Sequence, residues 1–250
     1  MPPYVLSATE WLNNNQGILA LALFAISAAY GWLSGIFSGL RRKPKFRLRV
    51  IDGPTFVTVM STHGQQNGYA THRTAISIYL RVTNIGSAPA DIDSVCVGYH
   101  WALRPFSKLW LKYSLGWFWL EQQAVAITDF QIQIGTNTKY YPFLTQVSAV
   151  SGARSETYLD VGRSTNGVVY FEQPESFGGC FPRSVGGKVR LAIKVTDSFG
   201  GQHIKKFWIP RVTLAEARKF NPTFGLTLST LRGDREPTEP DTDNHGNLIP

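Results

Sequence analysis

The pattern of apolar and polar positions divides the chain into two parts with different periods. Residues 17–40, GILALALFAISAAYGWLSGIFSGL, contain no charged side chain. As an α-helix they would extend about 36 Å, which exceeds the roughly 30 Å hydrocarbon core of a bilayer and leaves some length for tilt. Arg41, Arg42 and Lys43 follow at once. The pattern therefore predicts one transmembrane helix over residues 17–40.

From residue 45 onward the apolar period is two, which is the period of a half-buried strand. In residues 73–83 the apolar side chains share one face, and Ser77, Tyr79 and Arg81 are expected on the solvent side. The same alternation recurs over residues 188–196, where the apolar residues are expected on the inner face, and around 46–50, where Arg47 and Arg49 are left on the outer face. Further strands are predicted over residues 55–60, 92–101, 125–134, 157–161, 168–172 and 204–209. Turns are expected between strands at Asn67-Gly68, Asn166-Gly167 and Gly186-Gly187.

Short strands with regular turns, and a helical period only near residues 213–220, favour a mainly β fold. We expect an N-terminal transmembrane helix, an antiparallel Ig-like β-sandwich, a short C-terminal helix and a disordered tail. Residues 80–92 resemble the strand, Asn-x-Gly turn, Pro, strand hairpin of immunoglobulin-like domains, a resemblance that implies a fold class. The expected divisions are a short N-terminus over 1–16, the helix over 17–40, a basic segment over 41–49, the sandwich over 45–212, a short helix and extension over 213–231, and an acidic tail over 232–250.

Charge is concentrated beside the apolar segment. The formal net charge is +8, and six basic residues lie within residues 41–49, whereas residues 1–16 carry only Glu10. Because basic residues are retained on the cytoplasmic side, we expect a single-pass membrane protein with its N-terminus outside and its C-terminal body in the cytoplasm. That the membrane is a bacterial inner membrane is implied only by the resemblance in layout to bacterial membrane proteins. The residues assigned to topology and lipid headgroups are Arg41, Arg42, Lys43 and Lys45. Direct nucleic-acid binding is the less favoured interpretation of this basic segment.

The predicted helix carries small residues at intervals of four, namely Ser27, Gly31, Gly35 and Gly39. In a continuous helix these positions share one face, and small residues at this spacing let two helix backbones approach closely. One hypothesis is that the chain forms homo-oligomers through this face. The other is that glycine is simply tolerated in membrane helices.

Residues 106–120 combine tryptophan and lysine in a segment too short and too charged to span a bilayer. Three interpretations stay open: a long connection packed on the sandwich, a contact with lipid headgroups, or a patch that binds a partner. The patch consists of Trp110, Trp117, Trp119, Lys108 and Lys112.

The two cysteines, Cys96 and Cys180, exclude a disulfide scaffold; we expect reduced thiols, with one bridge as the alternative. Catalytic signatures are missing as well. The sequence has no Gly-x-Ser-x-Gly elbow and no complete phosphate loop. We therefore expect no enzymatic activity and no cofactor or metal. The scattered histidines are His63, His72, His100, His203 and His245.

The layout, one membrane helix followed by a cytoplasmic sandwich, resembles that of small membrane components of bacterial anti-phage systems. The resemblance implies a non-catalytic membrane effector whose sandwich binds a protein partner, such as a nucleoprotein sensor. The alternative hypothesis is a constitutive inner-membrane scaffold that holds a cytoplasmic or envelope complex in place.

Overall fold

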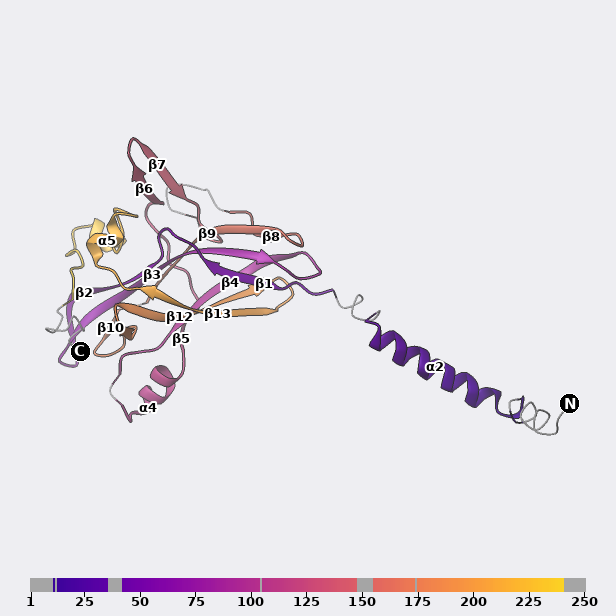
Figure 1. The fold of residues 1–250 in the computed structure, drawn as a ribbon. Coiled ribbons are helices and arrows are strands. Elements are labelled where there is room, and N and C mark those ends of the chain that lie inside the picture. The colour runs from indigo at the N-terminus through magenta and orange to yellow at the C-terminus, as the bar shows by residue number, and fades with distance from the viewer. Residues whose placement is uncertain are drawn as a thin grey trace. The chain divides into compact units, whose positions relative to one another are not determined.

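The structure is a computed structural model, and it divides into two compact units, Met1–Lys43 and Pro44–Pro250 (Figure 1). The two units are described separately below. The residues that the structure describes are 11, 13–35, 42–103, 105–147, 155–173 and 175–240.

The first unit contains the helix α2 (Gln16–Leu33), which is long and apolar enough to cross a membrane. Its 18 residues extend about 27 Å, close to the thickness of a bilayer core. The helix ends seven residues before its predicted end, because Ser34 closes the last turn and Gly35 adopts a left-handed backbone with φ of +75°. The described helix is therefore shorter than the helix predicted over residues 17–40, and residues 36–40 lie outside the described residues.

The second unit confirms the predicted antiparallel sandwich. Its first sheet is organised around β3 (Tyr69–Asn84), which pairs with β1 (Phe46–Val50), β2 (Phe56–Gln66), β9 (Ser164–Glu172) and β10 (Ser176–Phe177). In its second sheet β12 (Lys188–Asp197) pairs with β4 (Ala90–Tyr99), β11 (Ser184–Val185) and β13 (Gln202–Pro210), and β4 also pairs with β5 (Phe118–Leu120) and β8 (Tyr158–Leu159).

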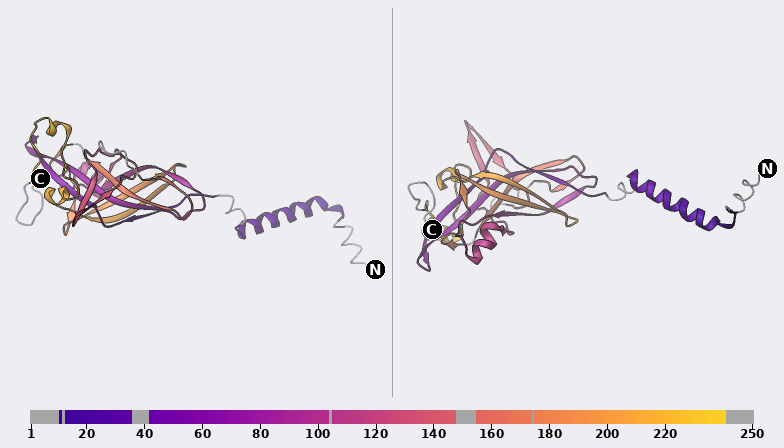
Figure 2. Two further views of the ribbon diagram at one scale, coloured as in Figure 1. Left: turned by 90° about the horizontal axis from the view of Figure 1, so that it is seen from above. Right: turned by 60° about the horizontal axis from the view of Figure 1, so that its bottom comes forward.

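The remaining elements lie outside the two sheets. They are the hairpin β6 (Phe130–Ile134) and β7 (Asn137–Tyr141), the helical turns α4 (Lys108–Trp110) and η1 (Leu111–Leu115), and the short helices α5 (Leu214–Arg218) and α6 (Leu228–Leu231). The right-hand view of Figure 2 shows the β6–β7 hairpin and α4, which are labelled in Figure 1, projecting from different sides of the sandwich.

The inner core lies between the two sheets and follows the predicted alternation. Ile76, Ile78 and Leu80 of β3 meet Leu191 and Ile193 of β12, and all five side chains are fully buried. The apolar positions of period two in the sequence are thus the inward positions of the sandwich.

A second core covers the outer face of the first sheet, which the alternation did not predict. The hairpin β6–β7, α5 and the segment around Phe224 pack there, so β3 is buried on both faces over most of its length. Ser77 and Tyr79, predicted to face solvent, are buried, whereas Arg81 is exposed as predicted. Burial is tolerated because the Ser77 hydroxyl donates to the Pro54 carbonyl at 2.8 Å, and the Asn166 amide donates to the Tyr79 hydroxyl at 2.5 Å.

The predicted turn at Asn166-Gly167 is wrong, because both residues lie within β9, where Gly167 pairs with Leu80. A Cβ atom on Gly167 would lie 2.5 Å from the backbone of Leu144. Gly167 therefore permits the close approach of two backbones, which is the other common use of glycine in a strand. The Asn67-Gly68 and Gly186-Gly187 turns are confirmed, and their positive φ angles suit two-residue hairpins.

Residues 233–240 also differ from the prediction of a disordered tail from residue 232. Thr238 exchanges two backbone hydrogen bonds with Ser61 of β2, at 2.9 and 3.2 Å, and Glu236 pairs with Arg218 at 3.2 Å. The capping box of Thr213 and Glu216 starts α5, which buries Leu214 in the second core. Residues 241–250 lie outside the described residues.

Candidate binding face

The outer face of the second sheet is open, in contrast to that of the first. Strand β12 alternates apolar residues, which enter the inner core, with Lys188, Arg190 and Lys194, which point outward. A period of two therefore places the cations of this strand in one row on the outside of the sandwich.

Strand pairing brings aromatic side chains from distant parts of the sequence beside these cations. Arg190 pairs with Trp208 of β13, and Ala192 pairs with Lys206 on one side and Gly98 on the other. Gly98 in turn pairs with Trp119 of β5. Directly paired residues project from the same face of a sheet. We call this surface the aromatic-basic face, and it consists of His100, Trp117, Trp119, Arg190, Lys194, Lys206 and Trp208.

The Trp119 ring lies flat on the sheet because Gly98 has no side chain. A Cβ atom at Gly98 would lie 2.9 Å from the Trp119 ring. The rings of Trp117 and Trp119 have centroids 6.2 Å apart, and the His100 ring lies 4.0 Å from that of Trp117. The three rings form a continuous, half-buried row.

Cations cover these rings. The Lys194 ammonium lies 4.8 Å from the Trp119 centroid, and the Arg190 and Lys206 cations lie 5.9 and 5.5 Å from that of Trp117. Each contact is within the range of a cation–π interaction. Long basic side chains on a sheet surface can swing aside, so the ring faces are available to a ligand that also satisfies the cations.

A pocket of about 300 Å³ adjoins the aromatic-basic face, and His100, Arg190 and Trp208 belong to both. The His100 Nδ1 donates to the Gly116 carbonyl at 2.7 Å, which fixes the ring at the pocket wall. The lining residues include no carboxylate; they are His100, Ser114, Leu115, Arg183, Val185, Arg190 and Trp208. The pocket is therefore suited to an anionic group.

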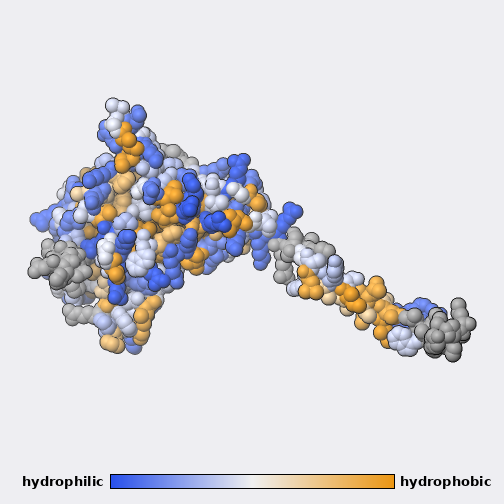
Figure 3. All heavy atoms as spheres, in the orientation of Figure 1, coloured by the Kyte–Doolittle hydropathy of each residue, from blue (hydrophilic) through white to orange (hydrophobic). Residues whose placement is uncertain are grey.

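The structure divides the patch predicted from residues 106–120. Trp117 and Trp119 belong to the aromatic-basic face, whereas Trp110, Lys108 and Lys112 lie on the α4–η1 segment. That segment exposes apolar side chains, and Figure 3 shows hydrophobic atoms at the lower end of the domain, where Figure 1 places α4. The exposed side chains are Phe106, Leu109, Leu111 and Leu115. Tyr113 packs on Trp101 with ring centroids 4.4 Å apart, which holds the connection against the sandwich.

The sequence prediction missed Trp208, Lys206, Arg190, Lys194 and His100 as members of one surface. The available signal was the cations at alternate positions of residues 188–196, which were correctly expected to point outward. Their aromatic neighbours come from β5 and β13, and strand order, which local pattern does not determine, brings them together.

The residues predicted to mediate helix association are placed unevenly. Ser27 and Gly31 lie four residues apart on α2, Gly35 follows the end of the helix, and Gly39 lies outside the described residues. The four positions therefore do not form one face of a helix that the structure describes.

The basic juxtamembrane residues are also partly described. Arg42, Lys43 and Lys45 are exposed, while Arg41 lies outside the described residues. Lys45 joins the sandwich, because its carbonyl accepts from the Ile85 amide at 2.8 Å. Arg47 and Arg49 occupy the exposed positions of β1, as the alternation predicted.

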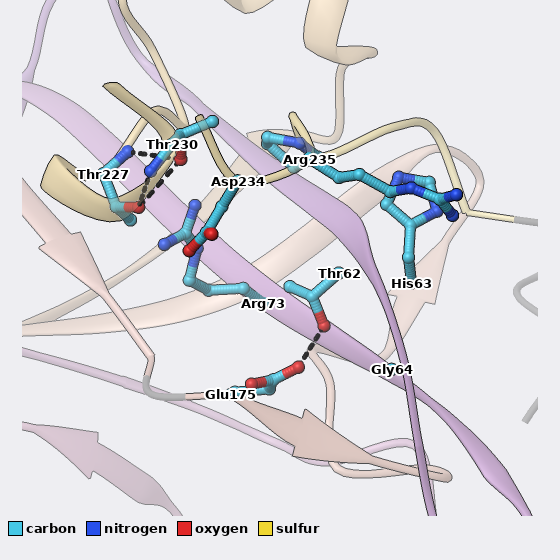
Figure 4. A pocket seen from close by; sticks show the side chains of 10 residues that line it. Thr62, His63, Gly64, Arg73, Glu175, Thr227, Thr230, Asp234 and Arg235 are labelled. Atoms are coloured by element: carbon cyan, nitrogen blue, oxygen red, sulfur yellow. Dashed lines mark hydrogen bonds between the residues drawn. The ribbon is translucent and has the colours of Figure 1, made fainter. Parts of the chain in front are cut away.

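A polar pocket of about 460 Å³ lies between β2 and the C-terminal segment (Figure 4). Thr62 donates to Glu175, and hydrogen bonds from Thr62 and Thr71 lower the pKa of the Glu175 carboxyl. His63 Nε2 lies 3.0 Å from the Glu236 carbonyl. Glu175 is therefore ionised at neutral pH. The His63 contact, together with the Ser61–Thr238 backbone hydrogen bonds, holds residues 233–240 against β2.

The described residues provide no group of histidine, cysteine or acidic side chains that could hold a metal ion. Cys96 and Cys180 are free, and burial raises the pKa of both thiols. At neutral pH they are protonated and poorly nucleophilic. The sequence matches no protein-family model and no curated protein.

Proposed function

We propose that this chain is a non-catalytic, membrane-anchored binding component. Helix α2 holds it in a bacterial inner membrane, and the sandwich in the cytoplasm binds a partner through the aromatic-basic face. The observation that supports this proposal is the contrast between the two sheets: one outer face is covered by a second core, and the other presents tryptophans and cations to solvent. Tryptophan and arginine are the side chains that contribute most often to binding energy at interfaces.

The orientation rests on charge asymmetry. Residues 1–16 carry only Glu10, whereas residues 41–49 carry six basic residues. The positive-inside rule places the basic flank, and with it the sandwich, in the cytoplasm. A reporter fused after Pro250 tests this: alkaline phosphatase should be inactive there and a cytoplasmic fluorescent protein active, and the reverse pattern would contradict the orientation.

A photo-crosslinking amino acid tests the binding face in cells. Placed at position 208, which is 55% exposed, it should give a discrete adduct. The matched control is position 140, where Tyr140 is 63% exposed on the β6–β7 hairpin. Equal labelling at both positions, or none at position 208, would argue against the aromatic-basic face as the binding site.

We propose further that the partner-bound protein acts as a membrane effector in anti-phage defence. The supporting feature is the layout: a domain built for binding is attached to a single apolar helix with the small pair Ser27 and Gly31. Induced expression with the cognate trigger should depolarise the membrane, measured with a potential-sensitive dye, and Gly31→Ile should reduce the depolarisation. Unchanged potential and growth with partner and trigger present would contradict the effector role.

The second candidate function is a constitutive scaffold that tethers a complex to the inner membrane. It is favoured by the end of α2 at Leu33, which leaves Gly35 off the helix and shortens the surface available for self-association. A scaffold predicts harmless expression and the same monomeric state for the wild type and Gly31→Ile in a membrane two-hybrid assay.

A further inference from the structure

We infer that the aromatic-basic face binds single-stranded nucleic acid, with a phosphate in the adjoining basic pocket and bases stacked on the tryptophan rings. The inference concerns the same face as the proposed function and rests on it, and it names the class of partner. Three observations support it: rings and cations lie side by side on this face, the pocket lining carries arginines and no carboxylate, and the Trp119 ring lies flat over Gly98.

The pocket supplies the phosphate site. Arg183, Arg190 and His100 line a volume of about 300 Å³, and its lining contains no carboxylate. Arginine binds phosphate oxygens with two parallel hydrogen bonds, so two arginines at one pocket favour a phosphate over a simple halide or a neutral ligand. Trp208 forms part of the same wall, so an aromatic ring lies beside the anion site.

Rings and cations alternate away from this pocket. Arg190 and Lys206 lie over Trp117, and Lys194 lies over Trp119. A nucleic acid strand alternates phosphates with flat bases. It can therefore contact both kinds of group at once, because its phosphates pair with the cations and its bases stack on the tryptophan rings. Sequence-tolerant single-strand binding uses this combination of a basic surface with aromatic stacking platforms.

The geometry disfavours other anionic partners. Trp119 lies flat on Gly98 and is half-buried, so it cannot insert into a lipid headgroup layer in the way that projecting tryptophans do. The centres of protein interfaces are depleted in lysine, whereas here lysine lies over the central rings. A duplex keeps its bases stacked inside and would leave the rings without ligands.

From the sequence, we expected the excess of basic residues to contact lipid headgroups. That expectation concerned residues 41–49. The aromatic-basic face contributes a separate set of cations, which only strand pairing brings together.

The test uses the full chain in nanodiscs of zwitterionic phosphatidylcholine. The probe is a fluorescent mixed-sequence single-stranded DNA of about 16 nucleotides, a length that spans a typical single-strand binding domain. Fluorescence anisotropy measures binding as a function of salt, with the RNA of the same sequence and the matching duplex in parallel. Three phosphate contacts predict a slope of log K against log salt of about −2.

Two triple variants with the same change in net charge separate the face from general electrostatics. Arg190→Glu, Lys194→Glu and Lys206→Glu together should weaken binding by at least about tenfold. The control replaces Arg47, Arg49 and Arg81 by Glu; these arginines are exposed on the first sheet, where Arg49 pairs with Arg81, and no tryptophan lies among them. The control should change affinity by less than about threefold.

Trp208→Ala tests stacking. It removes an exposed ring without altering charge, so the affinity for the single strand should fall about fivefold at an unchanged salt slope. The melting temperature of each variant verifies folding, and alanine replaces glutamate in the triple variant if charge reversal impairs folding.

Each outcome decides the inference. Loss of single-strand binding in the face variants but not in the control supports it. Equal affinity for duplex and single strand, equal loss in both triple variants, or no binding overturns it. Binding of vesicles that contain phosphatidylglycerol through the same residues also overturns it in favour of lipid. A position-208 protein adduct in cells, combined with no nucleic-acid binding, would retain the proposed function while rejecting this partner.

Discussion

The outer faces of the two sheets use aromatic side chains for different purposes. On the first sheet, Phe130 contacts Phe143, Tyr170 and Phe224, in each case edge to face, inside the second core. On the second sheet, the Trp119 ring lies flat over Gly98, cations lie over the rings of Trp117 and Trp119, and Trp208 is exposed to solvent. One sheet is therefore covered by the chain's own side chains on both faces, whereas the outer face of the other stays open to solvent.

The difference follows from the side chains at the outward positions of the central strands. The outward positions in the middle of β3, namely Ala75, Ser77 and Tyr79, are uncharged, and the two polar side chains find hydrogen-bond partners when covered. The charged outward residues lie nearer the ends of the strand, where Arg73 pairs with Glu172 and Arg81 stays exposed. Those of β12 include Arg190 and Lys194, and covering them with an apolar layer would cost several kcal/mol for each unpaired charge. A second core can therefore form on the first sheet and not on the second.

The largest effect should come from emptying the second core. Phe130→Ala removes a fully buried ring and should lower the free energy of unfolding by about 3–5 kcal/mol. Urea denaturation of the full chain in detergent measures it. Trp208→Ala, on the open face, is the matched control and should change stability by less than about 0.5 kcal/mol. Similar losses for both variants would remove the distinction between the faces.

The next largest effect is expected at Gly167 of β9, where two backbones lie close together. Gly167→Ala places a methyl group against the backbone of Leu144, which cannot move aside as a side chain can. We expect a loss of about 1–3 kcal/mol, measured in the same denaturation experiment. A neutral substitution would show that the segment at Leu144 is free to shift.

Gly98→Ala makes the matching change on the open face. The new methyl group meets the Trp119 ring, which can tilt toward solvent, so the stability loss should stay below about 1 kcal/mol. The tilt should shift the tryptophan emission and weaken nucleic-acid binding. An unchanged emission spectrum would contradict the flat placement of Trp119.

The last prediction concerns the pH dependence of stability at the end of the second sheet, where Asp197 accepts from His203 at 2.8 Å. Burial on its own raises the pKa of the Asp197 carboxyl, but hydrogen bonds from His203, Gly201 and Phe199 outweigh it and hold the pKa below its ordinary value of 3.8. A folded-state pKa below the unfolded value stabilises the protein above pH 3.8, and this stabilisation is lost as pH falls through the folded pKa.

Asp197→Asn should therefore flatten the decline in stability below pH 3.8, measured by urea denaturation across acidic pH. A decline as steep as that of the wild type would assign the acid sensitivity to other carboxyl groups.

Local pattern was sufficient for much of the fold. The period of two identified the inward residues of β3 and β12 and the exposed positions of Arg47 and Arg49. The turn residues Asn67 and Gly68 identified a hairpin. It failed where glycine has two uses: Gly35 ends a helix that was expected to continue, and Gly167 lies inside a strand that was expected to turn. A glycine in the sequence is compatible with the end of a helix, with a turn, or with a close approach of two backbones inside a strand. The surrounding structure decides which of these occurs.

The sequence by itself determined the apolar helix, the β class of the domain and the outward row of cations on β12, because each depends only on the spacing of neighbouring side chains. Only the tertiary structure decided that the first sheet is covered, and that Trp117, Trp119 and Trp208 join Arg190, Lys194 and Lys206 on one face. The physical reason is that a period of two shows only which face of its sheet a residue occupies. Which strand lies beside it depends on the strand order, which pairs residues that are far apart in the chain.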